Sequence, residues 1–167
     1  YLSLEHEQDA MKERVLQSTD GWAYFYFCVL GLNGSFFFYL ILTTIFYFKQ
    51  IYSAFPVSFY SMAAAKCAIF LTLFVLKVTS LASYNTQIIG GSLGVLLCFI
   101  GIVKVSESMP GSSTGFAYVL ILEFLGALCT FVYQAGAVRI GSYYHTSVYI
   151  YYYASAAFSC IITSGFG

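Results

Sequence analysis

The chain contains 167 residues, of which 60% are hydrophobic, 20% aromatic and only 8% charged. A soluble domain carries about 25% charged residues because its surface must face water, and a mean hydropathy of +0.80 also argues against such a surface here. Seven acidic and seven basic side chains balance, without the basic excess that nucleic-acid binding requires. The composition excludes a soluble enzyme, a disordered segment and a nucleic-acid binder, and it indicates a polytopic membrane protein.

The first twenty residues differ from the rest of the chain. They are polar and of mixed charge, unlike a cleavable signal sequence. We expect residues 1–20 to form a cytoplasmic polar lead-in and residues 21–167 to form a transmembrane domain. Because the chain begins at Tyr1 and ends soon after an apolar segment, we expect it to belong to a longer protein.

Five apolar segments follow the lead-in. A helix needs about 20 apolar residues to cross the hydrocarbon core of a bilayer. The segments are apolar on all sides, whereas the strands of a membrane barrel alternate polar with apolar residues. We therefore predict an all-α transmembrane bundle, with helices at about residues 21–48, 56–76, 88–103, 115–138 and 147–164.

The basic residues of the short loops predict the orientation of this bundle. Cytoplasmic loops carry an excess of Lys and Arg. A cytoplasmic N-terminus places four basic residues inside and two outside: Lys12, Arg14, Lys77 and Arg139 against Lys49 and Lys104. We expect a multi-pass protein of the plasma membrane with its N-terminus in the cytoplasm.

The five cysteines do not indicate a disulfide framework or a metal site. One lies in each apolar segment, where cysteine usually acts as a small hydrophobic residue: Cys28, Cys67, Cys98, Cys129 and Cys160. The chain has no C-x-x-C pair and no His/Cys cluster. The sequence therefore predicts neither a metal nor another cofactor.

Two ionisable residues fall inside predicted membrane helices. Lys66 and Glu123 are costly there, so each is a candidate functional residue. They could pair with each other or face a common cavity. Alternatively, Lys66 could extend along its helix towards the interface, and Glu123 could be a structural partner between helices.

Other polar and small residues also admit two interpretations. Gly90 and Gly94 form a G-x-x-x-G pattern, which predicts a face for close helix packing. Gln134 offers a hydrogen-bond donor and an acceptor together. This pair matches either the edge of a nucleobase or a polar group of another helix, and spacing alone favours the second.

The order of segments resembles the N-terminal part of the equilibrative nucleoside transporter family. The resemblance rests on motifs in four segments: Leu30-Gly31-Leu32 with Tyr47-Phe48, Ile88–Leu93 through Val103-Lys104-Val105, Tyr133–Gly141, and Tyr144 with Ala154–Cys160. The chain departs from the family pattern at other positions: at Phe37-Phe38-Tyr39, where the family usually has Pro-Trp-Asn, at Gln87 and Arg139, which replace an arginine and a glycine, and at Ile150–Tyr153 in the fifth segment.

The resemblance implies a fold and a set of binding residues. It implies a major-facilitator-like architecture, of which this chain supplies the first five helices. It also implies that Gln134 hydrogen-bonds a base, that Phe38 stacks on it, and that Tyr39 and Leu42 line the same wall.

The function expected on these grounds is transport of nucleosides or nucleobases by alternating access, within the lipid bilayer and without enzymatic chemistry. Two alternatives stay open. One is a non-transporting or degenerate membrane scaffold. The other is a carrier of another superfamily that moves lipophilic solutes.

Overall fold

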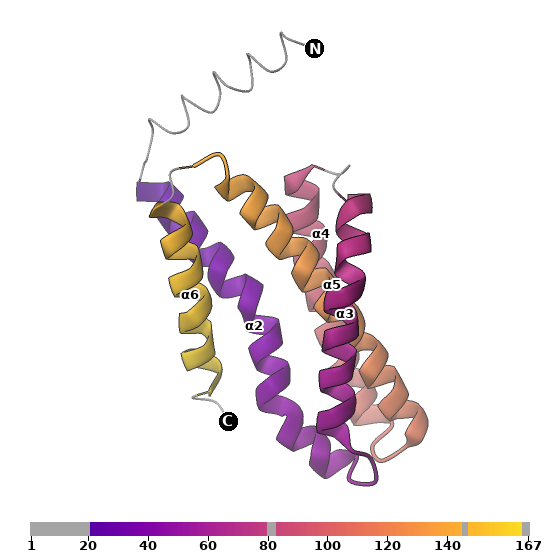
Figure 1. Ribbon diagram of the computed structural model, residues 1–167. Coiled ribbons are helices and arrows are strands. Elements are labelled where there is room, and N and C mark those ends of the chain that lie inside the picture. Colours follow the sequence, from indigo (N-terminus) through magenta and orange to yellow (C-terminus); the bar gives the residue numbers. More distant parts are fainter. Residues whose placement is uncertain (1–20, 80–82, 145–146, 165–167) are drawn as a thin grey trace.

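The computed structural model describes residues 21–79, 83–144 and 147–164 (Figure 1). In these ranges the chain is helical and contains no strand, which confirms the all-α class. The predicted lead-in at residues 1–20 lies outside the described residues. The helices are α2 (Gly21–Ile51), α3 (Val57–Thr79), α4 (Tyr84–Ser108), α5 (Ser113–Gly141) and α6 (Ser147–Ser164).

Two helices in the described part of the chain are long and apolar enough to cross a membrane. They are α4, with 25 residues, and α5, with 29 residues. Residues Val57–Thr72 of α3 form a shorter apolar stretch. This finding rests on length and composition, and it gives weak support to a membrane location.

Serine caps explain why α4 and α5 begin before their apolar segments. The Ser83 hydroxyl accepts a hydrogen bond of 3.3 Å from the backbone N–H of Thr86, and that of Ser112 accepts one of 2.9 Å from Gly115. Such caps satisfy N–H groups that lack a partner in the first turn of a helix. Between α4 and α5, Gly111 adopts a positive φ of 71°, which a residue without a Cβ accommodates easily.

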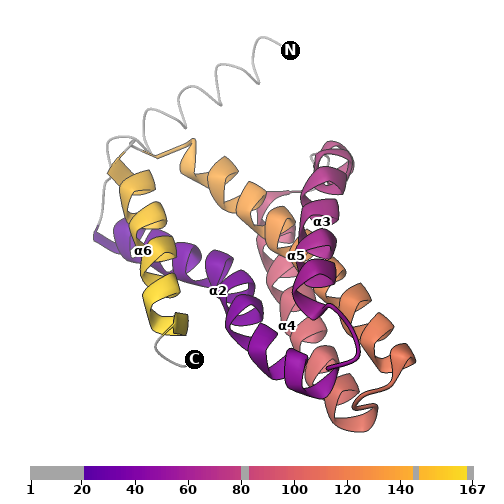
Figure 2. The ribbon, with the colours of Figure 1, turned by 60° about the horizontal axis from the view of Figure 1, so that its bottom comes forward.

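Helix α5 runs through the middle of the bundle. It contacts α4, α3 and α2, while α6 packs along the first half of α2 (Figures 1 and 2). The α2–α3 and α4–α5 connections lie at one end of the bundle. There the Tyr52 hydroxyl donates a hydrogen bond of 3.5 Å to the Met109 carbonyl, and the rings of Phe55 and Phe116 stack at 4.7 Å. Successive helices α2 to α5 therefore run in alternating directions.

Two clusters of buried side chains hold the helices together. The first joins α2, α4, α5 and α6, and it comprises Phe27, Leu30, Ile88, Tyr133, Ala137, Ile140, Val148 and Tyr152. The second lies near the α2–α3 and α4–α5 connections, and it comprises Phe48, Tyr52, Val57, Cys98, Ile102, Phe116 and Val119. The space between the two clusters is where a cavity can form.

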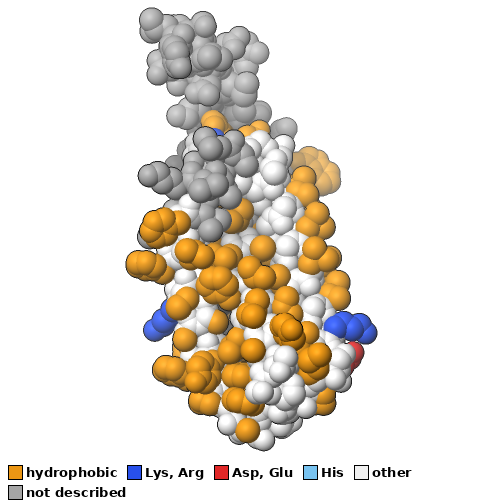
Figure 3. Space-filling view, turned by 90° about the vertical axis from the view of Figure 1, so that its right-hand side faces the viewer, with side chains coloured by type: hydrophobic (Ala, Val, Ile, Leu, Met, Phe, Trp, Pro, Cys, Tyr) orange, Lys and Arg blue, Asp and Glu red, His pale blue; other side chains and the backbone are white. Residues whose placement is uncertain are grey.

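The outer surface of the bundle is largely apolar. Hydrophobic side chains cover much of the face in Figure 3, and few charged ones interrupt them. Large side chains are exposed on different helices, with Phe46 and Phe70 each 72% exposed and Leu97 67% exposed. A water-soluble protein rarely exposes contiguous apolar surface of this kind, whereas lipid tails cover it at no cost.

The glycine prediction for α4 is confirmed at Gly94, where a Cβ would meet the Cys129 side chain of α5, and is wrong at Gly90. Nothing lies within 4 Å of a Cβ built on Gly90, so this residue does not take part in close packing. Gly91 does: its Cβ would lie 2.8 Å from both the Cys129 carbonyl oxygen and Tyr133 Cβ of α5. Gly91 and Gly94 are three residues apart, which places them on the side of α4 that faces α5.

Candidate functional site

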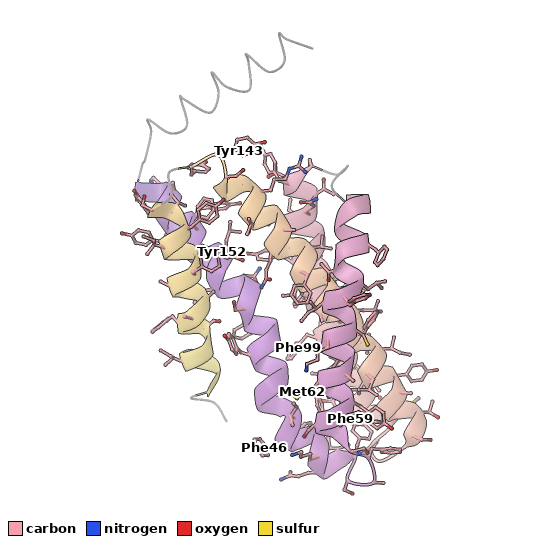
Figure 4. The ribbon with its side chains drawn as sticks, viewed as in Figure 1. Phe46, Phe59, Met62, Phe99, Tyr143 and Tyr152 are labelled. Carbon is pink, nitrogen blue, oxygen red and sulfur yellow. The ribbon has the colours of Figure 1, made fainter. Side chains whose placement is uncertain are left out.

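A cavity of about 430 Å³ lies between α2, α3 and α5. Ligand sites commonly have volumes of roughly 300–1,000 Å³, with mostly apolar walls and a few placed polar groups. The lining follows this description, since Met62 and Ile69 of α3 and Ile45 of α2 supply apolar surface. Met62 is labelled in Figure 4.

One face of α5 forms the longest wall of the cavity. Its lining residues are Glu123, Ala127, Thr130, Phe131 and Gln134. Their separations of three and four residues place them in a single stripe along the helix. The small side chain of Ala127 leaves room for the cavity, while Phe131 contributes an aromatic ring to its wall.

The Glu123 carboxyl is the most unusual group in this wall. The residue is only 4% exposed, and within the described chain neither carboxylate oxygen has a hydrogen-bond partner. Ser61 of α3 also lines the cavity, and its buried hydroxyl lies beside the Glu123 carboxyl. Leaving such groups unsatisfied is costly, so both are candidates to bind a ligand.

Lys66 lines the same cavity from α3, with an exposed side chain. The structure thus brings the predicted pair Lys66 and Glu123 to one cavity. Their side chains form no ion pair within 4.0 Å; in the described ranges the ion pair found is Lys104–Glu107, at 3.6 Å on the surface of α4. Whether Lys66 and Glu123 are coupled stays a prediction.

Gln134 takes the interhelical role, one of the two alternatives predicted for it, and it also lies in the wall of the cavity. Its Nε2 donates a hydrogen bond of 3.1 Å to the backbone carbonyl of Gly34 on α2, which is the interhelical role. The side chain also lines the cavity. Because one amide N–H suffices for the Gly34 bond, the amide keeps a second N–H and a carbonyl oxygen as hydrogen-bonding groups.

The remaining predicted site residues lie on α2. Tyr39 lines the cavity, as does Ser35 one turn earlier. The side chains of Phe38 and Leu42 lie outside the described residues, although their backbone belongs to α2.

The sequence analysis missed the α3 wall and the hydroxyls. Ser61, Ala65 and Ile69 line the cavity at four-residue intervals, and Thr130 lies between Glu123 and Gln134. The small and polar residues at positions 61 and 65 were the available signal for this face of α3. Thr130 also donates a hydrogen bond of 2.9 Å to the Gly126 carbonyl in its own helix.

A second, more open hollow is lined mainly by α2 and α4, with Tyr133 of α5 and Ser159 of α6. Its polar groups are bonded to one another: Asn33 Nδ2 donates to Ser92 Oγ at 3.0 Å, and the Tyr133 hydroxyl donates to the Leu30 carbonyl at 2.8 Å. Hydrogen bonds of this kind between helices hold the helices together. The α2–α3–α5 cavity is the better candidate site because it also contains the buried Glu123 carboxyl.

In the part of the chain that the structure describes, no three His, Cys, Asp or Glu residues come together in a way that could hold a metal ion. The described cysteines are free: Cys28, Cys67, Cys98 and Cys129.

The described residues thus form an all-helical protein with two candidate membrane-spanning helices. Its internal cavity is mostly apolar and contains a few polar side chains. No family model, no curated protein and no solved structure matches the chain.

Proposed function

We propose that this chain forms part of a multi-pass membrane carrier for nucleosides or nucleobases that works by alternating access. The observation that carries the proposal is the α2–α3–α5 cavity. It combines aromatic rings, from Tyr39 and Phe131, with hydroxyl, amide and carboxyl groups. A nucleoside has matching features. The flat face of its base stacks on aromatic rings, while the edge of the base and the ribose form hydrogen bonds.

In this proposal all five described helices cross the bilayer. Besides α4 and α5, helices α2, α3 and α6 have 31, 23 and 18 residues. At about 1.5 Å per residue, even the shortest nearly matches a hydrocarbon core of about 30 Å. The exposed apolar side chains on each helix favour contact with lipid.

The resemblance to equilibrative nucleoside transporters supports the choice of substrate. Its most specific segment, Tyr133–Gly141, belongs to α5 and begins beside the cavity. Carriers of this type hold the substrate near the bilayer midplane between two bundles that rock around it, and the substrate leaves unchanged. The proposal places the protein in the plasma membrane, with its N-terminus in the cytoplasm.

Uptake of radiolabelled uridine and guanosine tests the proposal. The complete protein is expressed in cells that lack nucleoside uptake, and saturable uptake above the background of untransfected cells is the expected result. No saturable uptake by protein that reaches the cell surface would contradict the proposal.

A pair of neighbouring alanines on α3 provides a matched control. Ala65 lines the cavity, whereas Ala64 does not. Ala65→Leu fills part of the site and should reduce uptake, while Ala64→Leu adds the same atoms outside the cavity and should preserve it. Equal uptake by the two variants would argue that substrate passes elsewhere.

A further inference from the structure

The two most polar groups of the α5 wall lie at opposite ends of the cavity. Glu123 and Gln134 both line it, and they are eleven residues apart on one helix. At a rise of 1.5 Å per residue, their backbones are separated by about 16.5 Å along the axis. A free base cannot contact both side chains. A nucleoside can extend towards both, because its ribose is attached on the side of the ring system away from the Watson–Crick edge.

The two ends offer different chemistry. Both Glu123 oxygens are buried, and the Ser61 hydroxyl of α3 is the donor beside them. A carboxylate accepts hydrogen bonds at both oxygens and donates none. Its best partner is therefore a group with two adjacent N–H donors, since such bidentate, charge-assisted bonds are the strongest.

Among nucleosides, guanosine alone of the common ones has two adjacent donors on its Watson–Crick edge, at N1 and at the 2-amino group. Inosine lacks the 2-amino group and keeps a single donor. Adenosine and cytidine place a donor beside an acceptor, and uridine places its one donor between two acceptors. An acceptor that faces a carboxylate oxygen is repelled.

We propose that Glu123 recognises the base of a guanine nucleoside by accepting hydrogen bonds from N1–H and the 2-amino group, an inference that rests on the proposed carrier function. The base edge lies at Glu123, Phe131 provides an aromatic surface between the two ends, and the Gln134 carbonyl oxygen accepts from a ribose hydroxyl. Lys66, which lines the same cavity, carries the opposite charge.

The test compares unlabelled guanosine with inosine as inhibitors of labelled guanosine uptake by the complete, unaltered protein. The two compounds differ by one amino group. Guanosine should inhibit roughly tenfold more strongly, as expected when one of two paired hydrogen bonds is lost. Free guanine should inhibit less well than guanosine because it cannot reach Gln134.

Glu123→Gln replaces one acceptor by a donor, so the preference for guanosine over inosine should disappear. The matched control is Glu107→Gln, which makes the same change at an exposed carboxylate on α4, outside the cavity. This control should retain the preference. Surface labelling of both variants checks that they fold and reach the membrane.

Several outcomes overturn the inference. Equal inhibition by guanosine and inosine overturns it while leaving nucleoside transport in place. A preference for guanosine over inosine that persists in Glu123→Gln also overturns it. So would a site that does not prefer guanosine but is inhibited by the simple aromatic amine tyramine, provided that this inhibition requires Glu123. Absence of saturable uptake of every nucleoside removes the proposed function as well.

Discussion

Tyr133 of α5 donates a buried hydrogen bond of 2.8 Å from its hydroxyl to the backbone carbonyl of Leu30 on α2. The next residue, Gln134, donates to Gly34, one helical turn further along α2. Two consecutive side chains of α5 thus bind two carbonyls on the same face of α2. This double contact fixes the position of α2 against α5 and so sets the width of the cavity between them.

Tyr133→Phe should remove the first of these bonds while keeping the ring. The loss should cost roughly 0.5–1.5 kcal/mol, since a typical buried hydrogen bond contributes this much to stability. Thermal unfolding of the purified protein in detergent measures it. Tyr118→Phe is the control, because the ring of Tyr118 is exposed on the same helix. Equal shifts in the two variants would argue against the bond to Leu30.

Two neighbouring glycines of α4 should respond oppositely to alanine. Gly91→Ala places a methyl group 2.8 Å from a backbone carbonyl oxygen of α5, so the helices must separate, at a cost of roughly 1–3 kcal/mol. Gly90→Ala meets nothing within 4 Å and should stabilise the helix by roughly 0.5–1 kcal/mol. Unfolding in detergent again distinguishes them. A more damaging Gly90→Ala would mean that the register of α4 against α5 is wrong.

Gln134→Ala should weaken nucleoside uptake with little loss of surface expression. The substrate loses a hydrogen-bonding partner, and we expect KM to rise about tenfold, equivalent to about 1.4 kcal/mol. Gln134→Glu should change which nucleosides are accepted because it exchanges a donor for an acceptor. Gln50→Ala, at the exposed end of α2, is the control. Unchanged KM and selectivity in Gln134→Ala would leave Gln134 with only its Gly34 contact.

The charges of Lys66 and Glu123 should be coupled through the cavity that they share. Removing one charge leaves the other without compensation in a poorly solvated space, which costs more than removing both. Lys66→Gln and Glu123→Gln should each reduce uptake or stability more than the double variant does. A double-mutant cycle measures the coupling. Simple additivity would show that the two charges act independently.

Accessibility of introduced cysteines should report the orientation of the bundle. Ser53 lies in the turn after α2, and Ser142 follows α5 at the opposite end; both are exposed. With a cytoplasmic N-terminus, Ser53→Cys should react with an impermeant thiol reagent in intact cells. Ser142→Cys should react only after permeabilisation. The reverse pattern would invert the topology.

The helices could be predicted from the sequence because each apolar segment is long and bounded by polar residues. Helix α4 begins earlier than expected because Asn85, Thr86 and Gln87 are polar and indicated a loop, whereas the Ser83 cap stabilises them as a first helical turn. Composition alone does not reveal such a cap. It reveals only where the apolar part of a helix lies.

The candidate site could be predicted in part. Glu123 and Gln134 were recognisable because polar groups in an apolar helix need a reason to be there. The contacts that these two side chains make could not be predicted from the sequence. The Gly34 carbonyl and the Ser61 hydroxyl belong to other helices, and the register between helices depends on packing at positions such as Gly91, which the sequence assigned to Gly90.

Gly31 restricts the movement of α2 and α6 relative to each other. A Cβ built there would overlap the Tyr152 carbonyl oxygen and the Ser155 hydroxyl of α6, so the two backbones touch with no side chain between them. Neither helix can roll or slide past the other without a collision. Any rearrangement of the bundle should therefore carry the Gly31 region of α2 and the Tyr152 region of α6 together.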